Sequence, residues 1–536
     1  MTKSEDFYKP ENLFLSPRGE NFQDFIELVK YALEACSIWW SSSSTRAIPR
    51  ETELKAIKEK LNNEFKSNRD ILKFAPVKQL IERLCESIRL NDKNLVNVHP
   101  QPLLNSVVAT LLVTLQNPNN ISPDVSMPTR QMEEECVEYL KDILGLKNGR
   151  NGVSIKGTLV LDGTLGNLTA IFIAAERNKK ERKKEGISWS PRLHEGYLIT
   201  TKNAHYSVRK CARILGFGDN YIREVPVAVD EEYLRKNVGR VLRRNAEELQ
   251  KFYNGESYSF CLQPQVQDFE EQFHHIDQKR GKIDAVVLTH GSTLTGTIES
   301  ADDFLKMRQK LSPFFLHIDA ATGGFARLIP ELKTKMSAID EADSVIIDPH
   351  KLGYVPYPCG AILFRHEEDL RLMQELNTSP NLERVMPTIE GSRPGTGAAS
   401  FWIAVKTLGL DGYRKLISKC LEHARYLATL LDEHKFQVLH TIDLNTVCFT
   451  TKPANGQNKT NEAVAHLYKR VTEEGEYKIN FVSDFCQIRV KERPWENKSQ
   501  LTEIRAIRAV VTNPFTTEAT LENFVERLAY LRDRYL

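Results

Sequence analysis

Two short apolar runs in the middle of the chain each end in an acidic residue. The first is FFLHIDAATGG at residues 314–324, and the second is SVIIDPHKLG at residues 344–353. Short runs rich in aromatic and β-branched side chains, followed at once by polar residues and glycine, are typical of buried strands. The pattern predicts two strands whose far ends carry Asp319 in the first case and Asp348 with Lys351 in the second.

Similar runs occur on both sides of this pair. They lie at residues 158–161, 197–200, 285–288 and 361–364. Stretches with helical periodicity, such as 168–178 and 301–311, separate them. Strands that alternate with helices favour right-handed βαβ units and a mainly parallel central sheet, so the predicted fold class is α/β. Ligands bind such sheets outside the carboxyl ends of the strands, and we expect the functional residues there.

The two ends of the chain differ from this central part. Helical patterns occupy residues 22–40, 54–65 and 77–90. A segment of this size supports no large core of its own, so we expect residues 1–100 to form a helical arm that covers the main domain or a second subunit. Long helical stretches at 400–408 and 412–431 are followed by strand-like runs, a polar loop at 453–459 and a final amphipathic helix. The prediction is a large domain at 101–400 and a small α+β domain at 401–536.

The composition is that of an ordinary globular chain. The 536 residues are 41% hydrophobic and 27% charged, with 73 Lys and Arg against 71 Asp and Glu. The resulting net charge of +2 argues against a general nucleic-acid binder, which needs a basic surface. No uncharged apolar run reaches about 18 residues, the length of a membrane span. Residues 1–6 lead into no apolar segment, so we expect neither membrane insertion nor a signal peptide.

The nine cysteines are scattered along the chain and include no C-x-x-C pair. Disulfide frameworks and zinc sites cluster their cysteines. We therefore expect reduced thiols, no metal site and a cytoplasmic location.

Three strand ends together carry the groups that one cofactor requires. Lys351 offers an amine, Asp319 offers a carboxylate, and the turn LDGTLGN at residues 161–167 offers backbone N–H groups at the start of a helix. Each feature alone has an ordinary structural explanation: a solvated lysine, a helix cap and a tight strand–helix turn. In combination they fit pyridoxal 5'-phosphate, which needs an amine for a Schiff base, a carboxylate beside its pyridine nitrogen and donors for its phosphate.

Several motifs resemble those of the group II pyridoxal-phosphate-dependent amino acid decarboxylases. DPHK at 348–351 resembles that family's Schiff-base motif, and HIDAA at 317–321 resembles its His-Val-Asp-Ala-Ala. TKNAHYS at 201–207 resembles the segment whose histidine stacks on the pyridine ring, and THGST at 289–293 resembles the segment that touches the ring hydroxyl. The motifs keep the family's order and spacing. The resemblance implies the fold-type-I transferase fold of pyridoxal-phosphate enzymes.

The resemblance also implies a role for each motif residue. Lys351 forms the covalent link to the cofactor, Asp319 pairs with the pyridinium nitrogen, and His205 stacks on the exposed face of the ring. Ala321 packs on the opposite face, and Ser292 contacts the ring hydroxyl.

The phosphate is expected at the start of the helix that follows residue 161. Leu165 and Gly166 would give backbone N–H groups to it, with Thr164 near, although the family often has Ser where Gly166 stands. His350, beside Lys351, would relay protons or bind the phosphate.

The substrate-facing residues are predicted less directly. By resemblance, Arg508 aligns with the small-domain arginine that pairs with the substrate carboxylate, and Arg505 competes for that role. Many family members place a catalytic Tyr roughly thirty residues past the lysine, but no Tyr lies between Tyr357 and Tyr413. Tyr357, Tyr354 and His205 are the candidates left for protonating the substrate's Cα.

Within the group, the likeness is strongest to bacterial tyrosine decarboxylases. LFL at 13–15 with EN at 20–21, and DPHKLGYVPYP at 348–358, resemble their motifs, as do EGS at 390–392 and AAS at 398–400. PTIEGSRPG at 387–395 equally resembles sphingosine-phosphate lyase.

The implied function is decarboxylation of an L-amino acid, tyrosine first, by a homodimer. Acidic or small amino acid substrates stay open. So do three other functions: a carbon–carbon lyase or an aminotransferase on the same scaffold, and a catalytically silent paralogue that binds the cofactor or a partner.

Overall fold

The computed structural model describes most of the chain. The described residues are 22–41, 50–65, 77, 79–81, 83–84, 91–147, 155–184, 196–227, 262–264, 266–279, 281–300, 302–309, 314–374, 388–452, 457–491 and 499–535. The chain divides into two compact units, one made of residues 1–94 with 471–478 and the other of residues 95–470 with 479–536. Most of the helix predicted at 77–90, and the motifs at 13–15 and 20–21, lie outside the described residues.

The first unit contains two helices that pack against each other, α2 (Phe22–Ser41) and α3 (Glu51–Phe65). They confirm the helical patterns predicted for 22–40 and 54–65. An ion pair of 2.6 Å joins the Lys93 ammonium to the Glu476 carboxylate, and a β-bridge pairs Asn94 with Lys478. These contacts tie the two segments of this unit together. Its role as an arm stays a prediction.

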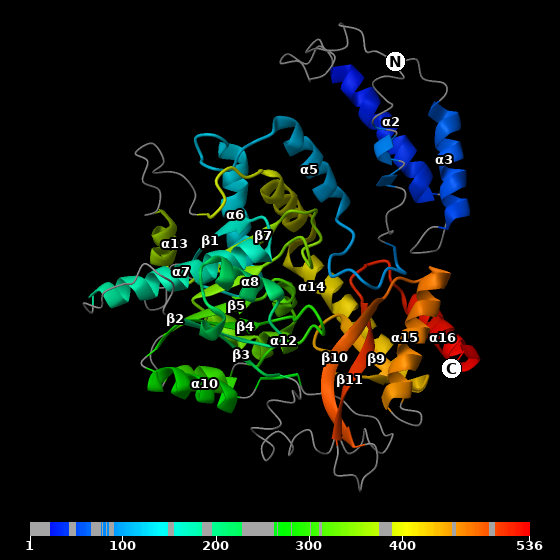
Figure 1. The fold of residues 1–536 in the computed structure, drawn as a ribbon. Helices are drawn as coiled ribbons and strands as arrows, with labels where there is room; N and C mark the ends of the chain where they lie inside the picture. The colour runs from blue at the N-terminus through cyan, green and yellow to red at the C-terminus, as the bar shows by residue number, and fades with distance from the viewer. Residues whose placement is uncertain are drawn as a thin grey trace. The chain divides into compact units, whose positions relative to one another are not determined.

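The second unit is built on a seven-stranded sheet (Figure 1). Its strands are β1 (Lys156–Val160), β2 (Gly196–Thr201), β3 (Ile222–Val225), β4 (Lys282–Thr289), β5 (Phe315–Asp319), β6 (Ser344–Ile347) and β7 (Gly360–Phe364). They lie in the order β1-β7-β6-β5-β4-β2-β3, and only β7 runs antiparallel to its neighbours. The mainly parallel sheet predicted from the sequence is confirmed, and each of the six strand-like runs named in that prediction falls on one of these strands.

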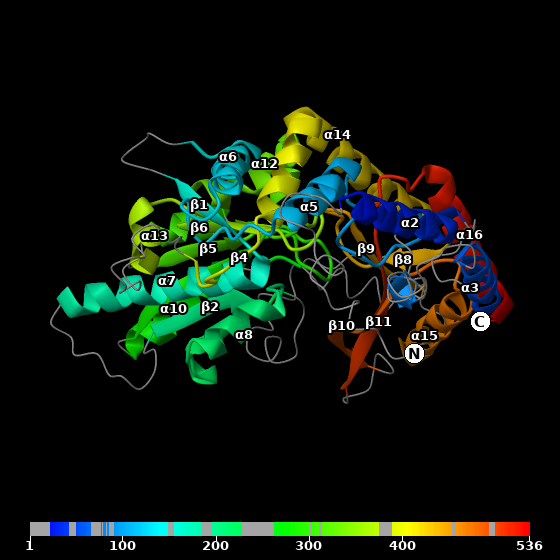
Figure 2. The same cartoon turned by 90° about the horizontal axis from the view of Figure 1, so that it is seen from above.

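Helices cover both faces of this sheet, as Figure 2 shows for α6, α12 and α14 on one side and α7 and α8 on the other. One hydrophobic core joins the sheet to α6 (Met127–Leu144), α10 (Val266–Gln278), α11 (Asp302–Arg308), α12 (Pro330–Lys335) and the first part of α14 (Thr396–Glu433). The second core joins it to α7 (Gly163–Lys184), α8 (Tyr206–Ile214) and α13 (Glu367–Gln374). Short 3-10 helices occupy η2 (Asp219–Tyr221), η3 (Gly324–Leu328) and η4 (Ser337–Asp340).

Side chains along β5 alternate between these two cores. Leu316 and Ile318 belong to the core with α6, whereas Phe315 belongs to the core with α7. Because successive strand residues point to opposite faces, His317 and Asp319 share the face of Phe315. The polar residues at the end of β5 therefore look toward α7 and α8.

The C-terminal part forms a second, antiparallel sheet in the order β10-β11-β9-β8. Its elements are β8 (Phe436–Val438), β9 (Thr446–Thr451), α15 (Gln457–Glu474), β10 (Asn480–Lys491), β11 (Ser499–Val510) and α16 (Glu518–Tyr535). The two helices predicted at 400–408 and 412–431 both lie within α14, which Gly409 divides, because its φ of 59° and ψ of −178° are not helical. The predicted loop at 453–459 is wrong at its end, because α15 already begins at Gln457.

Cysteines, apolar helices and clusters of metal-ligating residues in the described part of the chain also bear on the sequence predictions. Cys36, Cys136, Cys211, Cys359, Cys420 and Cys448 are unpaired thiols. None of the helices in this part of the chain combines the length and apolar composition that a membrane span requires. The same residues contain no group of three or more His, Cys, Asp and Glu side chains arranged to hold a metal ion.

Candidate active site

Six parallel strands of the large sheet end at one edge. β1 to β6 run in the same direction, so the segments that follow them lie along that edge. Asp319 is the last residue of β5 and pairs in register with Ile346 of β6, two residues before Asp348. The fold thus brings together the strand ends that were predicted to carry the chemistry.

Lys351 lies beside a buried carboxyl group. Its Nζ is 3.3 Å from Asp348 Oδ2 and 3.4 Å from Thr322 Oγ1. Burial raises the pKa of Asp348 to about 6, although the positive charge of Lys351 acts in the opposite direction. Asp348 Oδ1 is buried and has no hydrogen-bond partner.

Two glycines make room for the Asp348 carboxylate. A Cβ atom on Gly163 would lie 3.0 Å from Asp348 Oδ2, and one on Gly360 would lie 2.9 Å from Asp348 Oδ1. Real Cβ atoms rarely come this close to other atoms, so these positions favour glycine. The start of α7 therefore packs directly against the lysine-bearing segment.

Asp319 is held in one orientation by two N–H donors. The backbone N–H of Ala321 donates to Oδ1 over 3.2 Å, and Asn167 Nδ2 donates to Oδ2 over 3.0 Å. The side chain of Asp319 is buried. Ala321 itself is buried beside Gly163, where a Cβ atom would lie 3.1 Å from its own Cβ.

His205 caps the start of α8 with its own ring. Its Nδ1 lies 2.7 Å from Ser207 Oγ and accepts a longer hydrogen bond of 3.4 Å from the Ser207 backbone N–H. Burial lowers the pKa of the His205 imidazole, against the raising effect of the Asp319 charge. The charges of Lys351, Asp348 and Asp162 also affect the pKa of His205, so the ring lies near these three residues.

The rings of His350 and Tyr357 lie in contact beside the lysine. Their centroids are 4.0 Å apart with the ring planes tilted by 32°, and His99 packs edge-on against Tyr357 with a centroid distance of 5.3 Å. Burial lowers the pKa of His350 to about 3, and Lys351 adds to this shift. His350 Nδ1 accepts the Cys359 backbone N–H, so the neutral ring carries its proton on Nε2, 3.5 Å from Asp348. His350 is thereby held as a neutral donor.

Tyr357 and Tyr354 have opposite orientations. Tyr357 is half exposed, and burial raises the pKa of its hydroxyl to about 12. The Tyr354 hydroxyl is fully buried and lies 3.3 Å from Cys420 Sγ and 3.5 Å from the Thr512 carbonyl. It points into the core, so the suggestion that Tyr354 protonates the substrate is wrong.

The start of α7 carries an internal acceptor. The Leu165 N–H donates to Asp162 Oδ1 over 2.9 Å, and the Gly166 N–H donates to the Asp162 carbonyl over 3.1 Å. The Thr164 carbonyl accepts from Cys211 Sγ. The two N–H groups expected to bind phosphate are thus held by Asp162 in this structure, and their phosphate role stays a prediction.

Ser292 lies in the loop after β4, and Arg508 donates hydrogen bonds to that loop. The Ser292 hydroxyl lies 2.8 Å from Thr295 Oγ1. Arg508 donates from Nη2 to the Thr293 carbonyl over 2.7 Å and from Nε to the Leu294 carbonyl over 3.1 Å. A third donor, Nη1, reaches a backbone carbonyl at residue 96. In the described part of the chain the guanidinium makes no contact with the Lys351 group.

The residues at the strand ends fit pyridoxal 5'-phosphate. The buried Asp319 carboxylate, the Lys351 amine and the half-buried His205 ring lie at the same edge of the sheet. Asp348 Oδ1, which has no hydrogen-bond partner, adds an acceptor there. These are the groups that bind an aldehyde covalently and hold a pyridine nitrogen protonated. Lys351, Asp319, Ala321 and His205 would hold the ring.

Sequence reasoning missed Asn167, Ser207 and Asp162. All three stand inside motifs quoted from the sequence, but their side chains were given no role. The signal was present for Asn167, because an amide on the apolar face of a helix must find partners when it is buried. Glu299 was also missed; it accepts hydrogen bonds from Asn203 and from the Thr289 backbone N–H at the same sheet edge.

The comparison with protein families gives a single match, described as the pyridoxal-dependent decarboxylase conserved domain, over residues 78–253 and 265–452. The chain belongs to this family. It is therefore a pyridoxal-phosphate-dependent carboxy-lyase that decarboxylates an amino acid, and the cofactor predicted from the sequence is confirmed.

The curated relatives carry several substrate names. The chain is similar to L-tyrosine decarboxylase of Levilactobacillus brevis, with 24% identity over 96% of this chain and 93% of the relative. It is 27% identical to a probable L-aspartate decarboxylase of Archaeoglobus fulgidus over 75% of this chain and 85% of the relative. It is 24% identical to L-2,4-diaminobutyrate decarboxylase of Acinetobacter baumannii over 79% of each chain.

Solved structures confirm the fold-type-I prediction. The crystal structure of Oryza sativa TDC with PLP and tryptamine superposes with a TM-score of 0.75 over 97% of this chain and 99% of that chain, at 16% identity. At this identity the likeness concerns the fold.

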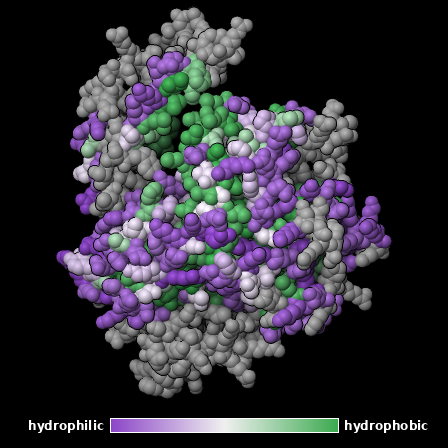
Figure 3. All heavy atoms as spheres, turned by 180° about the vertical axis from the view of Figure 1, so that it is seen from behind, coloured by the Kyte–Doolittle hydropathy of each residue, from purple (hydrophilic) through white to green (hydrophobic). Residues whose placement is uncertain are grey.

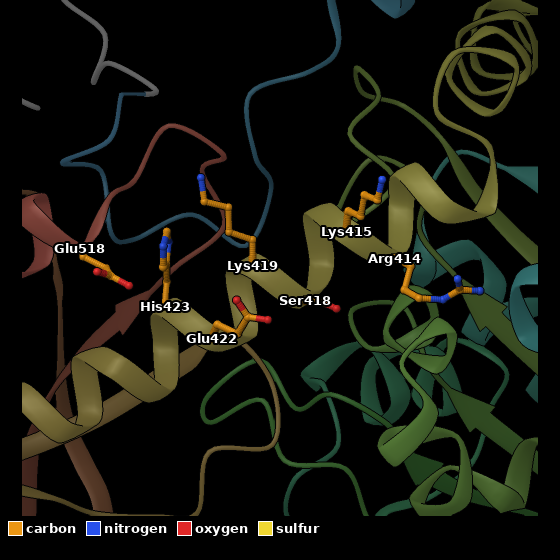
Figure 4. Close-up of a pocket in the computed structure, with 7 residues that line it drawn as sticks. All are labelled: Arg414, Lys415, Ser418, Lys419, Glu422, His423 and Glu518. Atoms are coloured by element: carbon orange, nitrogen blue, oxygen red, sulfur yellow. The ribbon is translucent and has the colours of Figure 1, made fainter.

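A separate hollow lies along α14 and contains none of the predicted site residues (Figure 4). It is lined by Arg414, Lys415, Ser418, Lys419, Glu422, His423 and Glu518. Cations and carboxylates are mixed there, and Arg414 already bonds the Leu328 carbonyl and Asp411. The strand-end group, rather than this hollow, is the candidate active site.

Proposed function

We propose that the chain decarboxylates L-tyrosine, or a closely similar aromatic L-amino acid, to its amine and carbon dioxide. The observation that carries this proposal is the aromatic group of His99, Tyr357 and His350 beside Lys351, with ring centroids 5.3 and 4.0 Å apart. Aromatic rings favour other aromatic rings at such distances. The name L-tyrosine decarboxylase among the curated relatives supports the same choice.

An aspartate side chain fits this group less well. Its second carboxylate would need a cation, and the donors of Arg508 are used on backbone carbonyls. The carboxyl groups of Asp162 and Asp348 raise the pKa of Tyr357, so they lie near it and would repel the side-chain carboxylate of an aspartate substrate. The same two acids favour a side chain with a second amine, so diaminobutyrate is the second candidate substrate.

The chain's own residues would divide the work as follows. Bound pyridoxal phosphate supplies the electron sink for the bond that loses carbon dioxide. Lys351 holds it covalently, and Asp319 keeps a proton on its ring nitrogen. His205 would contact the substrate carboxylate, and the Tyr357 hydroxyl would return a proton to Cα.

An amino acid panel scored for amine and carbon dioxide tests the substrate. We expect kcat/KM for L-tyrosine to exceed that for L-aspartate by at least about 100-fold, a difference of about 3 kcal/mol. A preference for L-aspartate would contradict the proposal. Aldehyde without carbon dioxide would identify a carbon–carbon lyase, keto acid an aminotransferase, and a protein without a cofactor absorbance band a silent paralogue.

One variant, assayed with two substrates, tests the aromatic group itself. His99→Leu removes one ring contact of Tyr357, so it should raise KM for L-tyrosine more than KM for L-2,4-diaminobutyrate. An equal effect on both substrates would show that the rings do not select the side chain.

We propose that the enzyme is a homodimer joined through α5 (Leu104–Gln116). One side of α5 packs on α14, yet Leu104, Val108 and Leu112 on its remaining surface are 81%, 53% and 56% exposed. These residues recur every four positions and so share one face of α5, and Figure 3 shows hydrophobic residues exposed on the rear face. A contiguous apolar patch of this kind marks an association surface.

Light scattering after size-exclusion chromatography tests the dimer. The wild type should have twice the mass of one chain, and Val108→Glu with Leu112→Glu should reduce it to a single chain. Phe515→Glu is the control, because Phe515 is 67% exposed but lies outside α5. A monomeric wild type would contradict the proposal.

We also propose a cytoplasmic location, because the nine cysteines are scattered along the sequence without a C-x-x-C pair and the six described ones are unpaired. Fractionation of the producing cells checks it.

A further inference from the structure

A continuous chain of hydrogen bonds connects Asp319 to His205. Asn167 Nδ2 lies 3.0 Å from Asp319 Oδ2 and 3.0 Å from Ser207 Oγ. Ser207 Oγ lies 2.7 Å from His205 Nδ1. The side chains of Asn167, Ser207 and Asp319 are buried at 1%, 0% and 5% exposure, so each polar group must be satisfied inside the protein.

The direction of this chain follows from its acidic end. An ionised carboxylate only accepts hydrogen bonds, so Asn167 must turn its amino group toward Asp319. Ser207 Oγ lies within hydrogen-bond distance of the same amino group, so it accepts the second hydrogen of Asn167 Nδ2. The amide cannot be reversed without pointing its oxygen at the carboxylate.

The opposite side of Asn167 agrees with this direction. Its Oδ1 lies 2.9 Å from His317 Nε2, which must therefore donate. Burial lowers the pKa of His317 to about 4, so the ring is neutral and its Nδ1 is an acceptor. The Ser344 hydroxyl, 2.7 Å away, donates to that Nδ1.

The Ser207 hydroxyl has one remaining role. It accepts from Asn167, and among the described residues the acceptor available for its own hydrogen is His205 Nδ1. The Ser207 backbone N–H points at the same nitrogen over 3.4 Å. Two donors directed at Nδ1 exclude a proton there, and the lowered pKa of His205 keeps the ring neutral.

We propose that Asn167 and Ser207 are positioning residues that fix His205 as the tautomer protonated on Nε2 and present this N–H to the substrate carboxylate. Nε2 has no hydrogen-bond partner in the described part of the protein, so it is available to a ligand. The presentation to substrate rests on the proposed function, whereas the tautomer rests on the hydrogen-bond chain alone.

This assignment limits what His205 does in the reaction. A neutral imidazole protonated on Nε2 donates a hydrogen bond there but has no lone pair to take a proton. His205 therefore binds the carboxylate that is to be lost. It is not the base, and the N–H of a neutral imidazole is too weak an acid to protonate Cα. The return of a proton to Cα then falls to another group, for which Tyr357 is the candidate.

The test is the tautomer of His205 in the holoenzyme, measured by nitrogen NMR of protein labelled with 15N-histidine. The spectrum of His205→Gln identifies the signals of this residue among the 13 histidines. We expect wild-type His205 to show a protonated Nε2 and an unprotonated Nδ1. A protonated Nδ1 in the wild type would overturn the inference, whatever the enzyme's activity.

Three variants separate positioning from a general structural role. Asn167→Asp replaces the donor with an acceptor, so the Ser207 hydroxyl should turn toward residue 167 and His205 should shift to Nδ1–H. Ser207→Ala removes the donor to Nδ1 and should give a mixture of tautomers. Ser344→Ala lies at the outer end of the chain and should leave the His205 signals unchanged, because Asn167 keeps its direction.

Kinetics give a second readout. Ser207→Ala should raise KM about tenfold, the loss of roughly one hydrogen bond, with a smaller change in kcat. If the tautomer is as expected but the enzyme forms no amine from any amino acid, the proposed function fails and the hydrogen-bond chain stands. If amine forms and Ser207→Ala changes neither tautomer nor KM, the inference fails and the function stands.

Discussion

At the scale of single residues, the most specific feature is the position of Lys351 between two oxygens. Its Nζ lies 3.3 Å from a buried carboxyl group, Asp348, and 3.4 Å from the Thr322 hydroxyl. Burial raises the pKa of Asp348 to about 6, so this carboxyl group can exchange protons near neutral pH. An amine beside such a group is well placed for covalent chemistry with an aldehyde.

Replacing Lys351 with Ala tests this position. The variant should lose turnover by about 10³-fold or more, because the covalent anchor for the cofactor is gone. It should also lose the absorbance band of lysine-bound cofactor while its circular dichroism stays that of the wild type. Lys415→Ala, on the outer side of α14, is the control and should keep both the band and the activity. Retained turnover in Lys351→Ala would contradict the assignment.

At the scale of elements, the contact of α7 with β6 sets the geometry of the site. Gly166 is the residue of closest approach, since a Cβ atom there would lie 2.6 Å from Ile346 Cγ2. The next residue, Asn167, carries the hydrogen bond to Asp319. The packing of one helix turn thus determines where the acidic end of β5 is held.

Gly166→Ala should move this turn. Overpacking of a tight contact costs about 1–3 kcal/mol, so the free energy of unfolding should fall by that amount in urea titrations. Cofactor affinity should fall with it, because Asn167 shifts away from Asp319. Gly391→Ala is the matched control, since a Cβ atom at Gly391 meets nothing within 4 Å. Equal unfolding midpoints for the two variants would refute the packing argument.

The elements themselves were largely predictable from the sequence, and the reason is local. The runs ending at Asp319 and at Asp348 carry enough β-branched and aromatic residues to predict strands, and β5 and β6 lie there. The partners of polar side chains were not predictable. Arg508 bonds carbonyls more than 200 residues away in sequence, at 293 and 294, and no local pattern reports such a choice.

The same limit applies within the site. Asp162 was quoted as part of a glycine turn, yet its carboxylate takes the Leu165 N–H that was expected to meet the phosphate. A side chain two or three residues away competes with any ligand for a helix N-terminus. The sequence is the same whether Asp162 or a ligand binds these N–H groups, so only the structure tells which of them does.

At the scale of the whole molecule, several carboxyl groups are buried so deeply that desolvation outweighs the effect of nearby cations and hydrogen-bond donors on their pKa. Burial raises the pKa of Asp284 and Glu299 to about 7, and that of Asp348 and Asp369 to about 6. Asp284 lies near the start of β4, while Glu299 and Asp348 lie at the active-site edge. The native state therefore binds more protons than the unfolded chain between about pH 4 and pH 7.

Asp284 offers the cleanest test of this effect, because it lies away from the site. Its carboxyl group accepts a hydrogen bond from Asn178 Nδ2. Since its pKa is raised from 3.8 to about 7 on folding, its contribution to stability is complete below pH 4 and is lost as the pH rises through 7. Asp284→Asn keeps an oxygen for Asn178 but removes the titration. The variant should gain in unfolding free energy relative to the wild type on going from pH 4 to pH 8, by at most about 4 kcal/mol.

Urea titrations at both pH values measure this gain, and Asp277→Asn, exposed on α10, is the control that should show none. A wild type that loses no stability relative to Asp284→Asn as the pH rises would mean that Asp284 is ionised without penalty. In that case the pocket formed by β4, Asn178 and Gly196 would have to admit water or a counter-charge. The pH above which the difference between the two proteins stops growing then reports the pKa of the buried group, so the same titrations distinguish a buried neutral acid from a solvated one.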